Sequence, residues 1–141
     1  MKTLFIAAKS KQKLDPNIIG KISKKLPQNI AVCYSIQFEQ QAKELANKLE
    51  NKHITLICQV LGCSRPNFPK NTQAILLIGQ GKFHSVSLQY ETGIQVYLLE
   101  NNKIIEVSKQ DVEKLSKKQK ASYVNYLSQD RVGILITNKP G

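Results

Sequence analysis

The chain alternates between short runs of apolar residues and longer stretches in which apolar residues recur every three or four positions. Continuous runs are typical of strands buried on both faces, and the longer spacing is typical of amphipathic helices. The runs predict strands at residues 4–7, 30–34, 54–58, 74–78, 95–99, 104–107 and 132–137. Helical spacing predicts helices over residues 16–26, 38–49, 84–91 and about 109–127.

Polar residues at the ends of these segments support the assignments. Asp15 followed by Pro16 is typical of a helix N-cap and first helical position. Asn101–Asn102 separates two apolar runs and predicts a turn. Ser108, three residues before Asp111, resembles a helix-capping pair.

Strands that alternate with helices predict an α/β fold. We expect a three-layer sandwich with a mostly parallel sheet, of the Rossmann or flavodoxin-like kind. Residues 1–28 are interpreted as an N-terminal strand and helix that lead into the domain, and residues 29–127 as the α/β domain itself. Residues 128–141 are interpreted as a terminal strand or the start of a following domain, because no helix follows the last apolar run.

The composition is that of a globular protein, with 141 residues, 41% hydrophobic and 22% charged. No apolar run reaches the roughly 18 residues of a membrane span, and the N-terminus lacks the features of a signal peptide. The three cysteines are an odd count without the spacing of a disulfide framework, which fits a reducing compartment. We therefore expect a cytoplasmic protein without a membrane partner.

The formal net charge of +11 is concentrated near the N-terminus, where residues 2–25 hold seven lysines and one acid. Only two of the 21 basic residues are arginine, and aromatic residues make up 6%. Proteins that read nucleic acids usually add arginine and aromatic side chains. A solvated lysine-rich helix face is therefore the favoured interpretation. A surface for an acidic or nucleic-acid-bound partner stays open as the alternative.

Candidate chemistry gathers in three loops, each of which follows a predicted buried strand. In an open α/β sheet, ligands bind beyond the carboxyl ends of the strands. If the strands are parallel, all three loops share one edge of the sheet. The loops are Ser35–Phe38, Gln59–Cys63 and Gly79–His84.

Each candidate residue also has a structural interpretation. Cys33 and Cys58 lie inside predicted strands and are interpreted as inert core cysteines. Cys63 lies in a loop and is the candidate ligand or reactive thiol, although no CxxC or HxxxH pair predicts a zinc site. His84 could be a structural helix cap, and the Gly79–Gly81 turn could bind an anion at a helix N-terminus.

The three loops resemble those of the diphthamide synthase family, the 2-(3-amino-3-carboxypropyl)histidine synthases. Gln59–Cys63 matches the family's Gln-Val-Leu-Gly-Cys loop. Gly79–His84 is similar to its Gly-Asp-Gly-Arg-Phe-His loop, and Ser35–Phe38 is similar to its Thr-x-Gln-Phe/Tyr-type segment. Residues 133–141 look like the first strand and loop of the family's third domain.

The resemblance implies three similar α/β domains around a [4Fe-4S] cluster, of which this chain would be the middle one. It also implies transfer of the 3-amino-3-carboxypropyl group of S-adenosylmethionine, as a radical, to a histidine of translation elongation factor 2. By match, Cys63 would be the metal ligand of this domain. Gln37, Gly79, Gly81 and His84 would line the cluster and cofactor cavity, and no residue of the chain is assigned as catalytic.

The sequence departs from the family pattern in ways that keep alternatives open. Gln80 replaces an acid, and one thiolate cannot hold a cubane cluster. The chain is therefore interpreted as an excised domain or one part of a split enzyme, inactive alone. Its partners would be other diphthamide synthase domains or subunits, in a homodimer or heterodimer. The alternatives are a non-catalytic binding module for elongation factor 2 or RNA, and a nucleotide-binding domain.

Overall fold

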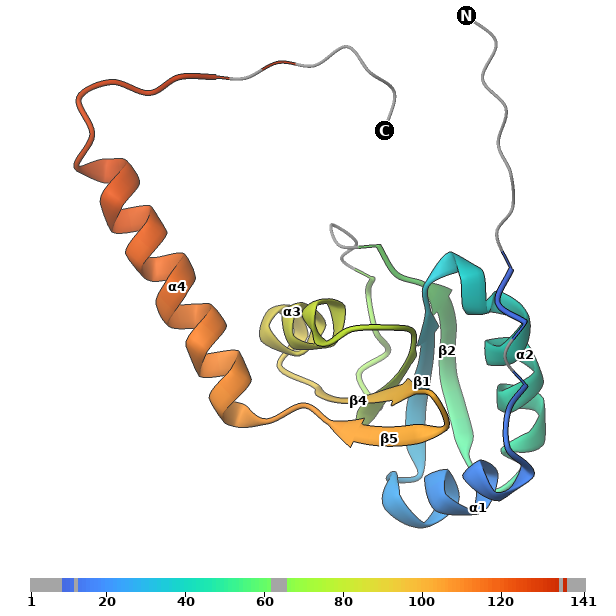
Figure 1. Ribbon diagram of the computed structural model, residues 1–141. Helices are drawn as coiled ribbons and strands as arrows, with labels where there is room; N and C mark the ends of the chain where they lie inside the picture. Colours follow the sequence, from blue (N-terminus) through green and yellow to red (C-terminus); the bar gives the residue numbers. More distant parts are fainter. Residues whose placement is uncertain (1–8, 12, 62–65, 135, 137–141) are drawn as a thin grey trace, which may run out of the picture.

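A computed structural model describes residues 9–11, 13–61, 66–134 and 136 (Figure 1). Every element predicted between residues 16 and 127 is present, whereas the strand predicted at 4–7 lies outside the described residues. The elements in chain order are α1 (Pro16–Lys25), β1 (Asn29–Tyr34), the 3₁₀ turn η1 (Ile36–Phe38), α2 (Glu39–Lys48), β2 (His53–Gln59), β3 (Ala74–Ile78), α3 (Lys82–Thr92), β4 (Gln95–Glu100), β5 (Lys103–Glu106) and α4 (Lys109–Leu127).

The strands form one five-stranded sheet in the order β2-β1-β3-β4-β5. The first four strands in this order are parallel, and β5 runs antiparallel to β4. All residues of β3 are buried, which explains its uninterrupted apolar sequence. The mostly parallel sheet expected from the sequence is confirmed. Its strand order has a switch point between β1 and β3, where open sheets of this class bind ligands.

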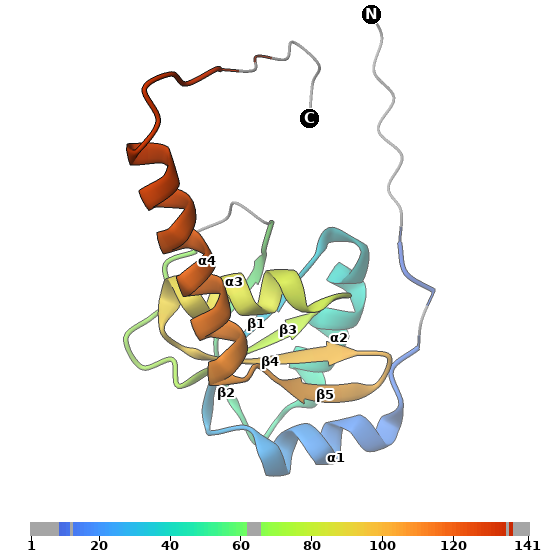
Figure 2. The same cartoon turned by 60° about the vertical axis from the view of Figure 1, so that its left-hand side comes forward.

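Helices cover both faces of the sheet and make three layers (Figure 2). On one face, Ile22 of α1 and Leu45 of α2 belong to a buried cluster with Val32 of β1. On the other face, Leu88 of α3 packs in a second cluster with Ile75 of β3. The three-layer α/β sandwich predicted from the alternating pattern is thereby confirmed.

The start of α1 is fixed by a cap and by a distant turn. The Asp15 side chain accepts a hydrogen bond of 2.9 Å from the Asn17 amide, as its position predicts. The Asp15 amide donates to Oδ1 of Asn102 at 3.1 Å, and the Asn102 side chain donates to the Lys13 carbonyl at 3.3 Å. Asn101 and Asn102 both have positive φ, 49° and 57°, and form the turn between β4 and β5. The hairpin turn therefore holds the chain that enters α1.

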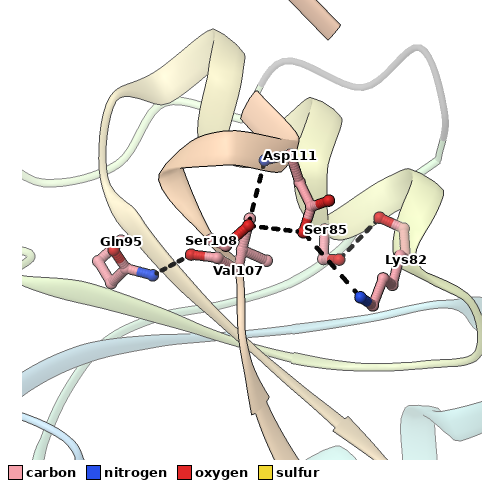
Figure 3. Close-up of polar contacts among 6 residues, drawn as sticks. All are labelled: Lys82, Ser85, Gln95, Val107, Ser108 and Asp111. Atoms are coloured by element: carbon pink, nitrogen blue, oxygen red, sulfur yellow. Dashed lines mark hydrogen bonds and ion pairs between the residues drawn. The ribbon is translucent and has the colours of Figure 1, made fainter. Parts of the chain in front are cut away.

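The first turn of α4 is joined to the rest of the domain by polar contacts (Figure 3). Ser108 Oγ accepts from the Asp111 amide at 3.1 Å, which confirms Ser108 as the N-cap. The Asp111 carboxylate lies 4.0 Å from Nζ of Lys82, at the start of α3. Gln95 Nε2 donates to the Val107 carbonyl at 3.0 Å, so the segment that leads into α4 is tied to β4.

Beyond its first turns α4 leaves the domain. Val112 and Leu115 are half-buried, and Val112 packs against the α3 face of the sheet. Tyr123 and Tyr126 continue the same helical stripe but are exposed, and α4 has no buried residue. Figure 1 shows the outer part of α4 extending away from the sheet. Among the described helices, none is long and apolar enough to cross a membrane.

The strand predicted over residues 132–137 is not formed by the described part of that segment. Residues 132–134 and 136 have no regular secondary structure, and Ile134 and Ile136 are 83% and 85% exposed. A strand needs a neighbour for its backbone hydrogen bonds, and the described sheet ends at β2 and β5 without adding this segment. The apolar pattern here therefore has no partner in the described residues. The start of a following domain in residues 128–141 stays a prediction.

Candidate functional site

The three loops singled out in the sequence begin at one edge of the sheet. β1, β2 and β3 run parallel and in register, so that Tyr34 pairs with Gln59 on one side and with Ile78 on the other. The Val60 amide donates to the Tyr34 carbonyl at 2.9 Å, and the Ser35 amide donates to the Ile78 carbonyl at 3.2 Å. These hydrogen bonds connect the starts of the three loops. The convergence predicted from the sequence is therefore observed.

A small cavity of about 110 Å³ lies at this edge, at the switch point between β1 and β3. It brings together the four residues that the sequence assigned to cofactor binding, Gln37, Gly79, Gly81 and His84. The complete lining is Ser35, Gln37, Phe38, Leu77, Gly79, Gln80, Gly81, His84 and Leu98. Polar side chains from the β1 and β3 loops thus meet around an apolar floor.

Gly79 keeps the cavity open beside the first loop. It is buried, and a Cβ added to it would lie 3.5 Å from Oγ of Ser35, which is ordinary van der Waals contact. A side chain at this position would therefore occupy space next to Ser35 without a severe clash. The Gly79 amide donates to the Leu99 carbonyl at 3.3 Å, so the backbone of this loop is also tied to β4.

Gly81 holds the turn before α3 in a conformation that requires glycine. Its φ of +80° and ψ of 143° lie in a region that residues with a side chain rarely adopt. Its amide donates to Oε1 of Glu100 at 2.8 Å. Glu100, at the end of β4, was missed by sequence reasoning because nothing near it marks this contact. Since a carboxylate already accepts this hydrogen bond, the Gly81 amide is not available to bind an anion.

His84 opens α3 at the wall of the cavity. Its ring is half-buried and lies edge-on to Phe83, with the ring centroids 5.6 Å apart. Within the described part of the chain, its Nδ1 is buried and has no hydrogen-bond partner. Buried polar atoms are usually paired, so an unpaired imidazole nitrogen at a cavity suits a group that binds a ligand.

Each of the three loops also presents one large apolar side chain to solvent. These are Ile36, Leu61 and Phe83, at 60%, 55% and 68% exposure. They follow three neighbouring strands, so they surround the same edge of the sheet. Exposed apolar residues around a polar cavity are typical of a surface that another protein segment covers.

Cys63, the predicted metal ligand, lies outside the described residues. The described residues contain no group of three or more His, Cys, Asp or Glu able to hold a metal ion. Cys33 and Cys58 lie on β1 and β2, as predicted, and their Sγ atoms are 3.6 Å apart. Two thiols in strands do not make the ligand set of an iron–sulfur cluster, which takes four. The described residues alone therefore do not fit such a cluster.

A second cavity, of about 680 Å³, is larger than the cavity at the carboxyl edge but lacks the predicted site residues. It lies between the segment that contains Phe68 and the C-terminal end of α3, where Tyr90 and Glu91 line it. The volume of a cavity therefore does not identify the site. The polar residues that line the cavity at the carboxyl edge identify it.

A family model described as "Putative diphthamide synthesis protein" matches residues 1–141. The chain belongs to this family. Among solved structures, it is similar to Dph2 from Pyrococcus horikoshii and to the same protein with a 4Fe-4S cluster, both at 26% identity and a TM-score of 0.63. These matches cover 78% and 77% of this chain but 35% of the other chains.

The chain thus spans about a third of the length of the Dph2 chains that it matches. A comparison with curated proteins finds no match. The resemblance expected from the loop motifs is confirmed for the family and for the fold. The loops that carry the resemblance are the same ones that begin at the carboxyl edge of the sheet.

Proposed function

We propose that the chain is one domain of a [4Fe-4S] enzyme of diphthamide synthesis. The complete enzyme transfers the 3-amino-3-carboxypropyl group of S-adenosylmethionine to a histidine of translation elongation factor 2. Cys63 is the ligand that this domain gives to the cluster. The family match over residues 1–141 and the likeness to a Dph2 structure with a 4Fe-4S cluster support this proposal.

The observation that carries the proposal is the convergence of Gln37, Gly79, Gly81 and His84 around one cavity. The loop that contains Cys63 starts from β2, next to β1 in the sheet. The amide of Gln37 and the imidazole of His84 are thus brought to one cavity by the loops that follow β1 and β3. Parallel strands explain this arrangement without further assumptions, because their carboxyl ends lie together.

The residues of this chain would bind and orient the aminocarboxypropyl end of the substrate. The Gln37 amide offers donors and an acceptor, and the unpaired Nδ1 of His84 offers one further hydrogen-bonding atom. These groups suit a ligand that carries an ammonium and a carboxylate. Gly79 leaves room for the ligand to approach the backbone. The bound cluster would supply the electron that cleaves S-adenosylmethionine.

The site is incomplete in this chain alone. A cavity of about 110 Å³ is smaller than the roughly 300–1,000 Å³ of pockets that enclose drug-sized ligands. Further domains or subunits, in a homodimer or heterodimer, would supply the other cluster ligands and close the cavity. They would cover Ile36, Leu61 and Phe83 and exclude water from the reacting groups.

Translation elongation factor 2 is the proposed protein substrate. The net charge of +11 favours encounter with an acidic partner, because opposite charge raises the association rate more than the final affinity. Lys21 and Lys24 on α1 are exposed and available for such steering. Salt would weaken this contribution, since surface charges are screened over roughly 8 Å at physiological ionic strength.

The decisive experiment is the Cys63→Ala variant in the assembled enzyme, reconstituted anaerobically with iron and sulfide. We expect loss of bound iron and loss of elongation factor 2 modification. Cys58→Ala removes a thiol from the neighbouring strand and is the matched control, with iron content kept. A Cys63→Ala enzyme that still binds a full cluster and modifies its substrate would exclude Cys63 as a ligand.

A second variant separates binding of S-adenosylmethionine from binding of iron. His84→Ala should leave the iron content unchanged and weaken S-adenosylmethionine binding by roughly five- to tenfold, as the loss of one hydrogen bond does. Calorimetric titration of the reconstituted enzyme measures the affinity. If His84→Ala instead lowers the iron content, His84 acts on the cluster and not on the substrate.

A further inference from the structure

Cys33 and Cys58 occupy matching positions on two adjacent parallel strands. They are directly paired in the register of β1 and β2, and both side chains lie on the α3 face of the sheet. Their Sγ atoms are 3.6 Å apart. The two thiols therefore already touch, and both lie on strands and not in the loops of the proposed site.

The two thiols differ in burial, in pKa and in their access to an oxidant. Cys33 is fully buried in the interior strand β1, whereas Cys58 is half-buried on the edge strand β2. The contact with Cys58 and burial raise the pKa of Cys33, which keeps it protonated. The hydrogen bond from Cys33 lowers the pKa of Cys58. Cys58 is thus the thiol that ionises first and the one that a small oxidant can reach.

We propose that Cys33 and Cys58 form a site of reversible oxidation, a dithiol that peroxide converts to a disulfide. The Cys58 thiolate attacks hydrogen peroxide, and with one proton this gives Cys58 sulfenic acid and water. The Cys33 thiol then attacks the sulfenic sulfur, the sulfur–sulfur bond forms, and a second water leaves. The two thiols lose two electrons in total, and peroxide is reduced to two waters.

The usual spacing of neighbouring strands is compatible with this bond. Neighbouring strands lie about 4.8 Å apart, and disulfides join Cα atoms separated by roughly 4.4–6.8 Å. The Sγ atoms must approach from 3.6 Å to about 2.05 Å, which side-chain rotation can supply. Disulfides that depart from ideal geometry are the more readily reduced ones.

Oxidation would join β1 and β2 next to their carboxyl ends. Cys33 and Cys58 each stand one residue before the last residue of their strand, Tyr34 and Gln59. Two of the three loops of the candidate site begin just beyond. The disulfide would therefore add a covalent link at the base of these loops, beside the existing hydrogen bond from Val60 to Tyr34.

The test treats the reduced full chain anaerobically with one equivalent of hydrogen peroxide and then alkylates it with iodoacetamide. We expect two of the three thiols to be protected, a mass lower by about two hydrogens before alkylation, and complete recovery with dithiothreitol. Peptide mapping should identify the Cys33–Cys58 cross-link. A cross-link between Cys58 and Cys63, or free Cys33 in the oxidised protein, would overturn the proposal.

Two variants sharpen the result and distinguish the pair from the proposed cluster ligand. Cys63→Ser should oxidise as the parent chain does, because its thiol takes no part. Cys33→Ala should give no intramolecular disulfide, and a second equivalent of peroxide should carry its Cys58 sulfenic acid to the sulfinic acid, which dithiothreitol does not reduce. Since Cys33 is a core residue, circular dichroism must first show that this variant is folded. If the Cys33→Ala variant is not folded, the peptide map of the parent chain tests the Cys33–Cys58 disulfide by itself.

Discussion

The sheet and the outer half of α4 are both rich in apolar residues, yet they differ in what covers them. In β3 every residue is buried, between helices on one face and the other. In α4 the stripe that starts with Val112 continues to Tyr123 and Tyr126, which are exposed. The apolar pattern predicted both β3 and α4, but it does not tell whether the partner of an element lies in the same part of the molecule.

The largest contrast is expected for the same substitution in the two regions. Leu76→Ala in β3 should lower the free energy of unfolding by about 2–5 kcal/mol, because it leaves a cavity between two packed layers. Leu127→Ala at the exposed end of α4 should change it by less than about 0.5 kcal/mol. Urea unfolding followed by circular dichroism measures both. Equal losses would mean that the end of α4 is packed in solution.

The second largest loss of stability is expected at the carboxyl edge of the sheet. Here the cost of a substitution depends on backbone conformation and not on burial. Gly81→Ala should cost about 1–3 kcal/mol, because alanine is strained at a φ of +80°. Gly79→Ala is the matched control and should cost less, since its φ is ordinary and its new Cβ meets Ser35 at 3.5 Å. Thermal unfolding of the two variants compares them. A greater loss in Gly79→Ala would show that space beside Ser35 limits the loop more than backbone strain does.

A smaller loss of stability is expected at the start of α4, between the sheet and the exposed half of the helix. Ser108→Ala removes the N-cap of α4 and should cost about 1 kcal/mol. Hydrogen exchange of the α4 amides should rise more than that of the β3 amides, because the cap holds the helix and not the sheet. Ser122→Ala in the exposed half of the helix is the control and should slow exchange slightly. Uniform acceleration in the sheet and the helix would mean that α4 supports the whole domain.

The smallest effect should have the opposite sign. Val124→Ala on the exposed half of α4 replaces a β-branched residue by the best helix former and should stabilise the chain by up to about 0.5 kcal/mol. Val32→Ala, at a buried position in β1, should instead destabilise it by about 1–3 kcal/mol. Unfolding in urea again provides the measurement. A destabilising Val124→Ala would contradict the exposure of this face.

Much of the fold could be predicted because local signals and tertiary packing agree. The continuous apolar runs of β1 and β3 predict strands covered on both faces, and two clusters cover them. Asp15 predicts the start of α1 from its own hydrogen bond to the helix. Such features depend on neighbouring residues, so the sequence contains them directly.

The remaining features depend on contacts between distant residues. The order β2-β1-β3 arises from crossovers that no local pattern encodes. The predicted strand over residues 132–137 was wrong for its described residues because an apolar run cannot provide its own partner strand. In the site, the parallel strands bring Gln37 and His84 together as predicted. The hydrogen bond from Gly81 to Glu100 joins residues 19 positions apart, and no local sequence pattern predicts it. Cys63 lies outside the described residues, so its role stays a prediction.

The turn at Asn101–Asn102 has a consequence for the order in which the chain folds. It joins β4 and β5 into a hairpin, the one antiparallel pair of the described sheet, and a hairpin closes within roughly 1–10 μs because its strands are adjacent in sequence. The parallel pair β1–β3 must first close a much longer loop. The Asn102 side chain also holds the segment that enters α1, 87 residues earlier. During synthesis α1 therefore leaves the ribosome long before its anchor exists, and we expect it to dock only after the hairpin has formed.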